Sequence, residues 1–148
     1  MFVISTRSFP PETGGMQNLM GGLANALLNH GPVKVFADKI EGSEEYDNFL
    51  KLEIERFGGI KLLRKYRKAN RLLDFIRSNQ NIRSIFFDHW KSIEKINDKA
   101  IEKIPTFCLI HSKEINHPVG SSLNKRVLNS FKKTKYIIAN SNFTKKLG

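Results

Sequence analysis

One stretch decides the fold of this chain: Phe9-Pro10-Pro11-Glu12-Thr13-Gly14-Gly15, which lies between a short apolar run at residues 2–4 and a helical pattern that begins near Met16. Prolines interrupt strands and helices, whereas glycines permit close approaches that a Cβ would prevent. We therefore expect a strand, a tight loop and the start of a helix. In an open α/β sheet such a loop lies at the carboxyl edge, where ligands bind, and the N–H groups of the following helix favour an anion. The sequence thus predicts a phosphate-facing loop.

Strand-like and helical segments alternate along the rest of the chain. Residues 2–6 and 106–110 read as buried strands, residues 85–87 as a central strand, and residues 33–37 and 136–139 as two further strands. Residues 50–57 alternate apolar with charged residues, as an edge strand does. Helices are expected at 16–29, 60–77, from Ser92 as N-cap to 104, and around Val127, Leu128 and Phe131, whereas the acidic residues 41–48 suggest a surface loop. The alternation predicts an α/β fold: a Rossmann-like, doubly wound, mostly parallel sheet with helices on both faces. At 148 residues, it should form one domain.

Two of the expected helices carry further predictions. In the helix at 16–29, we expect Leu19, Leu23, Ala26 and Leu27 to face inward and Gly21-Gly22 to allow close packing on the sheet. The helix at 60–77 has an apolar stripe, which we expect to be buried, at Leu62, Tyr66, Ala69, Leu73 and Ile76. Its other face carries six cations: Lys61, Arg64, Lys65, Arg67, Lys68 and Arg71. That basic face is either a membrane-docking surface or simply a solvated face.

The composition limits the partners and the compartment. Lysine and arginine (25) exceed aspartate and glutamate (14), so the formal charge is +11, which attracts phosphates, nucleic acid or an anionic membrane surface, unless these cations are ordinary solvated surface. A single cysteine, Cys108, excludes an internal disulfide and a typical zinc site, and we expect it to be buried in a strand. Because no apolar segment approaches membrane-spanning length and no charged leader precedes one, we expect a cytoplasmic protein.

Right-handed crossovers would bring the carboxyl ends of all parallel strands to one edge of the sheet. Several polar residues follow the expected strands and should share this rim. They are Glu12, Thr13, Gly14 and Gly15 in the first loop, Asp38, the pair Asp88 and His89, His111, and Ser141. This convergence predicts one functional site at the carboxyl edge.

The candidate residues allow several interpretations. The loop lacks the Gly-x-Gly-x-x-Gly and Gly-Lys-Ser/Thr patterns, which argues against a classical dehydrogenase or kinase, and a Gly14-Gly15 pair can also be a plain turn. His111 can polarise, donate to or position a substrate near neutral pH, or it can be a structural hydrogen-bonding residue. Asp88 and His89 suggest an acid–base pair or a metal site, but adjacent strand residues point to opposite faces, which argues against joint ligation.

Taken in order, these motifs resemble the N-terminal half of glycosyltransferase family 4, retaining nucleotide-sugar-dependent enzymes with the two-domain GT-B fold. The matching segments are Phe9-Pro10-Pro11-x-x-Gly14-Gly15, Leu23-Ala24-x-x-Leu27, Gly31-x-Val33-x-Val35, Thr106-x-x-x-x-His111 and Ile137-Ile138-Ala139-Asn140-Ser141. The resemblance implies that Gly14 and Gly15 lie beside the donor diphosphate, that His111 lies near the transferred sugar, and that Ser141 ends the last strand before the interdomain linker. It also implies sugar transfer without a divalent metal or other cofactor, onto a glycan or lipid-linked acceptor held by this domain.

The chain departs from that family in one respect. The family's second domain carries a basic pair for the diphosphate and a Glu-x7-Glu element for the nucleotide and sugar, and residues 1–148 contain no counterpart. We therefore expect this N-terminal domain to lack meaningful turnover alone, because catalysis needs groups from both sides of the cleft. The alternative hypothesis is a non-catalytic basic module that binds anionic lipid or nucleic acid. Nucleic acid is the less favoured partner, whereas a lipid acceptor would make the protein peripheral at the inner face of the membrane.

Overall fold

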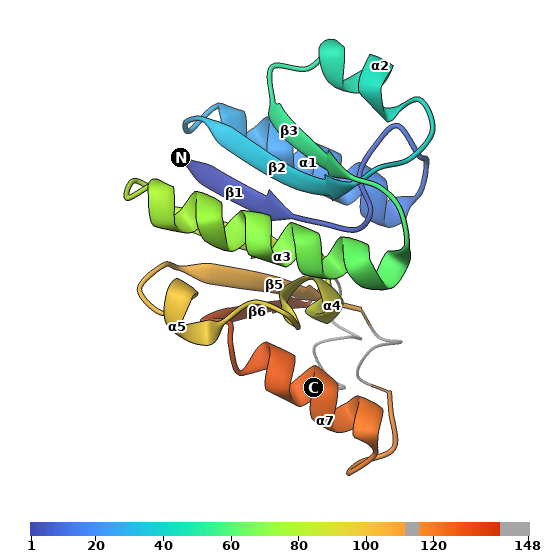
Figure 1. Ribbon diagram of the computed structural model, residues 1–148, viewed down its shortest axis with the longest axis vertical. Helices are drawn as coiled ribbons and strands as arrows, with labels where there is room; N and C mark the ends of the chain where they lie inside the picture. The colour runs from blue at the N-terminus through green and yellow to red at the C-terminus, as the bar shows by residue number, and fades with distance from the viewer. Residues whose placement is uncertain (112–115, 140–148) are drawn as a thin grey trace.

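A computed structural model describes residues 1–111 and 116–139 of the chain. A single six-stranded parallel sheet runs through it in the order β3-β2-β1-β4-β5-β6, so the structure is the expected Rossmann-like α/β fold (Figure 1). The strands are β1 (Phe2–Ser5), β2 (Val33–Asp38), β3 (Glu53–Phe57), β4 (Ser84–Phe87), β5 (Thr106–Ile110) and β6 (Tyr136–Ala139). Every described strand pair is parallel, which sharpens the expected "mostly parallel" sheet, and β3 lies at an edge as its alternating pattern predicts.

Helices cover the two faces of the sheet unequally. They are α1 (Gly15–Leu28), α2 (Ser43–Asn48), α3 (Lys61–Ser78), α4 (Trp90–Ile93), α5 (Asp98–Ile101) and α7 (Ser122–Phe131). Helix α1 packs on one face, whereas α3, α4, α5 and α7 lie on the other. Because all the described strands are parallel, the loops that follow them lie at one edge of the sheet, the carboxyl edge.

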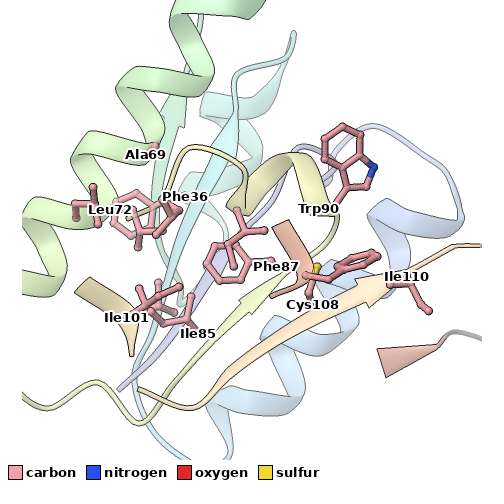
Figure 2. Packing of buried hydrophobic residues seen from close by; sticks show 14 of the residues in the cluster. Phe36, Ala69, Leu72, Ile85, Phe87, Trp90, Ile101, Cys108 and Ile110 are labelled. Carbon is pink, nitrogen blue, oxygen red and sulfur yellow. The ribbon is translucent and has the colours of Figure 1, made fainter. Parts of the chain in front are cut away.

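The larger core lies between the sheet and the helices that share the α3 face. Figure 2 shows Ala69 and Leu72 of α3 beside Phe36 of β2, and Phe87 and Cys108 from the central strands near Trp90 of α4. Cys108 is buried within β5, as expected. The second cluster packs α1 against the other face through Met20 and Ala24. At roughly 25 cal/mol per Å² of buried apolar surface, these two clusters provide most of the stabilisation of the fold.

Several local predictions were wrong. In α1 the fully buried side chains are Met20 and Ala24. Of the predicted inward residues, Leu23 and Leu27 pack against the same core, whereas Leu19 is 43% exposed and Ala26 is also exposed. Residues 43–48 form the short helix α2 instead of a loop. The predicted helix from Ser92 to residue 104 is two short helices, and their N-caps are His89 and Asn97 instead of Ser92. Asn97 caps α5 through its Oδ1, which accepts from the Lys99 N–H at 3.1 Å.

The fourth correction concerns α3. Leu62 and Tyr66 are 59% and 43% exposed, whereas Lys68, assigned to the solvated basic face, is 4% exposed. Gly59, with a φ of 82°, turns the chain from β3 into α3 in the left-handed region that favours glycine. The turn leaves the first two turns of α3 projecting past the carboxyl edge, so their apolar side chains have little sheet beneath them. The expected turn at 140–142 and the helix start at 143–148 lie outside the described residues.

Candidate functional site

The loop at 9–15 is held in place by a side chain from the edge strand. Phe9 is buried, and the Arg56 guanidinium on β3 lies 5.4 Å from its ring centroid. Arg56 Nη2 also donates to the Pro10 carbonyl at 2.6 Å, while the same group forms an ion pair with Asp47 of α2 at 2.7 Å. One arginine therefore joins β3, α2 and the loop, which fixes where α1 begins.

Gly14 and Gly15 form the N-terminus of α1, as predicted. The Gly14 carbonyl accepts the first helical hydrogen bond, from the Asn18 N–H at 2.9 Å. Gln17 folds back over Gly14 and donates through Nε2 to Glu12 Oε2 at 2.9 Å, so a Cβ at Gly14 would collide with the Gln17 amide. Nothing lies within 4 Å of the Cβ position of Gly15. The space beside Gly15 is therefore open at the N-terminus of α1, the end of a helix that favours an anion.

The Gly21-Gly22 pair does not pack on the sheet. A Cβ at Gly21 would lie 2.9 Å from Pro10 Cγ, whereas a Cβ at Gly22 would meet nothing within 4 Å. Gly21 is therefore needed where α1 passes the loop, and Gly22 is on the open side of the helix. The glycine pair was expected to let α1 pack closely on the sheet, but Gly21 instead lets α1 pack closely on the loop at 9–15.

Asp88 is a buried structural carboxylate at the end of β4. It is 1% exposed, and its Oδ2 accepts from the Thr6 hydroxyl at 2.9 Å and from the Arg7 N–H at 2.8 Å. Its Oδ1 accepts from the Ser92 hydroxyl at 2.6 Å. With three donors around it, Asp88 ties the end of β1 to the start of α4. It holds the rim in shape and offers little surface to a ligand.

The other predicted rim residues come from separate segments of the chain. His89 caps α4, where its Nδ1 accepts from the Lys91 N–H at 3.0 Å. His111 directly follows β5, is half-buried and lies at the same sheet edge as the loop, with β4 between β5 and β1. Glu12 and Thr13 are exposed on the loop, and Ser141 lies outside the described residues. The carboxyl edge therefore brings the loop and His111 to one side, while His89 and Asp88 serve the local structure.

Lys68 and Asp38 form a buried ion pair that the sequence did not predict. Lys68 Nζ lies 2.7 Å from Asp38 Oδ1 and 2.6 Å from the Thr6 carbonyl, to both of which it donates. Burial lowers the pKa of Lys68 below its usual 10.5, and the Asp38 carboxylate opposes this shift. Arg64 lies 3.5 Å from the second Asp38 oxygen. The pair therefore joins α3 to the ends of β1 and β2.

A cavity of about 420 Å³ opens above this pair, between α3, α4 and the side chain of Arg126 on α7. Eight cationic side chains and two carboxylates line it, a net formal charge of +6. Four of the cations are paired: Arg64 and Lys68 with Asp38, and Lys65 and Arg126 with Glu94. Of the lining cations, the other four have no ion pair with any described carboxylate, and they are Arg7, Lys61, Lys91 and Lys95.

Glu94 connects the helices on both sides of the cavity. Its Oε2 is 3.2 Å from Lys65 Nζ on α3, and its Oε1 is 2.7 Å from Arg126 Nη2 on α7. Burial raises the pKa of Glu94, but the hydrogen bonds from Arg126 and Lys65 outweigh this and hold the pKa below its usual 4.5. Glu94 therefore stays ionised at neutral pH and neutralises two cations of the wall.

Aromatic rings support the free cations of the wall. Lys91 Nζ lies 5.3 Å from the Trp90 ring centroid, and Lys95 Nζ lies 5.0 Å from the Tyr66 ring centroid. Such cation–π contacts are attractive and orient the ammonium groups.

A different depression, of about 560 Å³, lies beside Pro11 and Glu12 and includes Glu41, so its carboxylates would repel an anion. The cation-lined cavity is the better anion site.

Sequence reasoning missed the residues that build this cavity for a recognisable reason. Lys68 and Leu72 are one helical turn apart and share a face, and Leu72 is fully buried although the predicted apolar stripe omitted it. The apolar Leu72 on the basic side of the pattern is the signal that Lys68 points inward. No comparable sequence pattern indicates that Lys91 and Lys95 line a cavity. The sequence predicts one continuous helix there, whereas the chain leaves the helix after α4.

Compared with known protein families and curated protein sequences, the chain matches no family model and no curated sequence. In residues 1–111 and 116–139, no helix is long and apolar enough to cross a membrane. The same residues include no group of three or more histidine, cysteine, aspartate or glutamate side chains arranged to hold a metal ion. Whether the protein acts without a metal stays a prediction.

Proposed function

We propose that this chain is the acceptor-side domain of a retaining glycosyltransferase that moves a sugar from a nucleotide sugar to a glycan or lipid acceptor. One observation carries the proposal: the loop after β1 and His111 after β5 open at the same edge of a Rossmann-like sheet, with only β4 between them. Neighbouring strands are about 4.8 Å apart, so the two strand ends are roughly 10 Å apart. A glycosyl diphosphate is long enough to contact both.

The proposed roles follow from the local chemistry. The N-terminus of α1, open at Gly15, would accept the donor diphosphate through backbone N–H groups and the helix dipole. His111 would contact the transferred sugar and stabilise the charge that develops as the glycosidic bond to phosphate breaks. Glu12 and Thr13, which are exposed on the loop, would contact the acceptor. The nucleotide would be held by a second domain, which completes the cleft.

The test uses the chain joined to the C-terminal domain that the proposal requires. Nucleoside diphosphate release is measured with a panel of nucleotide sugars for the unaltered protein, His111→Ala and His30→Ala. His30 is an exposed histidine beyond the end of α1, at the amino edge of the sheet, and serves as the matched control. We expect His111→Ala to lower release at least about 100-fold, as loss of one transition-state contact does. Equal release of nucleoside diphosphate by the two variants would show that His111 takes no part in the reaction.

The same assay tests the cofactor prediction. If transfer needs no divalent metal, release continues in the presence of a chelator. Loss of release with chelator, restored by magnesium or manganese, would overturn that part of the proposal.

A second candidate function, a non-catalytic module that binds anions, is favoured by the charge of the cation-lined cavity. The two candidates give different results. A module that only binds would release no nucleoside diphosphate from any nucleotide sugar, in any domain context, yet would bind phosphate or anionic lipid in a salt-sensitive manner.

A further inference from the structure

We propose that the cavity between α3 and α4 is a binding site for a phosphomonoester group. The site is on the α3 face of the sheet, whereas the N-terminus of α1, where the donor diphosphate is proposed to bind, is on the other face. The cavity is therefore separate from the proposed donor site. The anion site itself does not depend on the proposed function. Only the assignment of the phosphoryl group to the acceptor rests on that function.

The cavity keeps a positive charge after its internal ion pairs are counted. Asp38 is matched by Lys68 and Arg64, and Glu94 by Lys65 and Arg126, so each carboxylate already faces two cations. The four cations left over come from the β1 end, the start of α3, α4 and the residue after Glu94. Cations that converge from separate elements on one concave surface focus a positive potential there. Such a wall suits a compact ligand with two negative charges.

The wall of the cavity is braced by contacts within the protein. The Lys68–Asp38 pair forms a rigid floor, since both side chains are mostly buried and Lys68 also donates to the Thr6 carbonyl. Asp88 holds the Arg7 backbone at the rim, through a hydrogen bond of 2.8 Å. The rings of Trp90 and Tyr66 lie under the ammonium groups of Lys91 and Lys95. Lys91 and Lys95 are therefore held near their binding positions, which lowers the entropy lost when a ligand binds.

The size and the mouth of the cavity suit a ligand larger than a phosphate ion. A volume of about 420 Å³ is in the range of small-molecule sites and leaves room for more than a phosphate ion. Leu62 lines the opening and is 59% exposed, and the adjacent Ile60 and Leu63 are 71% and 56% exposed. A phosphoryl group carried on a larger, partly apolar molecule would fit this combination of a cationic pocket and an apolar rim.

The experiment compares two double variants that remove the same amount of charge. Lys91→Gln/Lys95→Gln removes two free cations of the cavity. Lys132→Gln/Lys135→Gln removes two exposed cations near the start of β6, at the opposite edge of the sheet. Binding of inorganic phosphate to the unaltered chain and to each variant is measured by amide-resolved NMR titration, without donor and therefore independently of transfer. Folding of each variant is checked from the same spectra.

We expect saturable phosphate binding with shifts at Arg7, Lys61 and the α4 amides, weakened about tenfold or more in the cavity variant and less than about twofold in the control. Equal weakening in both variants would mean that only net charge matters and would overturn the site. Phosphate binding that does not saturate would also overturn the site, as would saturable binding to duplex DNA but not to phosphate.

Vesicles distinguish the sources of the phosphoryl group. Phosphatidylcholine vesicles with phosphatidic acid present a monoester, and vesicles with phosphatidylglycerol present a phosphodiester of similar surface charge. Selective binding to phosphatidic acid that the cavity variant loses would assign the group to a lipid. Weakened phosphate binding with no such vesicle selectivity would assign it to a soluble phosphomonoester; both outcomes support the site. If phosphate binds as expected but no sugar is transferred, the site stands and the proposed function fails.

Discussion

Lys68 Nζ lies 2.7 Å from Asp38 Oδ1, in a contact that joins the middle of α3 to the carboxyl end of β2. The lysine side chain is 5% exposed and the aspartate side chain 17% exposed. Removing one partner of a buried pair leaves the other charge without compensation, which is more costly than losing the pair. This contact is therefore the base on which the cation-lined cavity is built.

Lys68→Met should lower the free energy of unfolding by about 3 kcal/mol, because Asp38 and the Thr6 carbonyl both lose their buried donor. Asp38→Asn/Lys68→Met should be less destabilised than the sum of the two single variants, by about 1 to 3 kcal/mol. Urea denaturation of the four proteins measures this coupling. Strictly additive effects would mean that the two side chains do not interact in solution.

The glycine pair in α1 provides a matched comparison. Gly22→Ala should stabilise the protein by about 0.5 to 1 kcal/mol, because its Cβ meets nothing and alanine favours the helix. Gly21→Ala should be less stable than Gly22→Ala by at least about 1 kcal/mol, because its Cβ would lie 2.9 Å from the Pro10 ring. Thermal unfolding of both variants tests this. Equal stabilisation would show that α1 does not pack on the loop.

Glu94 should make stability depend on pH in the acid range. Its pKa is lower in the folded protein than its usual 4.5, so the stabilisation is complete above about pH 4.5 and is lost as pH falls through the lowered folded pKa. Glu94→Gln should therefore be less stable than the unaltered protein by about 1 kcal/mol at pH 7, with the gap closing below about pH 4. Melting temperatures between pH 3 and 7 measure the gap, and exposed Glu45→Gln is the control. A gap that stays constant with pH would contradict the ion pairs with Arg126 and Lys65.

The sheet could be predicted from sequence because buried parallel strands contain continuous apolar runs, as at residues 85–87 and 107–110. The short helices could not. Residues 43–48 have acidic residues and no apolar period, and α2 is held instead by tertiary contact, through Asp47 and Arg56. The break between α4 and α5 depends on Asn97 acting as a cap inside an apolar pattern that reads as continuous.

The site was only partly predictable for the same reason. Parallel strands place the loop and His111 at one edge, and the sequence predicts that much. The burial of Lys68 depends on Asp38 lying across from it, 30 residues away, and periodicity along one helix carries no information about such a partner. The exposure of Leu62 likewise depends on how far α3 projects past the sheet.

The most direct test of the proposed function is transfer of a labelled sugar. The chain joined to the C-terminal domain that the proposed function requires is incubated with labelled nucleotide sugars and with membrane lipid and glycan extracts as acceptors. The account predicts incorporation of label into an acceptor, equal to the nucleoside diphosphate released, with the anomeric configuration of the donor retained. Absence of both incorporation and release with every nucleotide sugar, in protein shown to be folded, would contradict it.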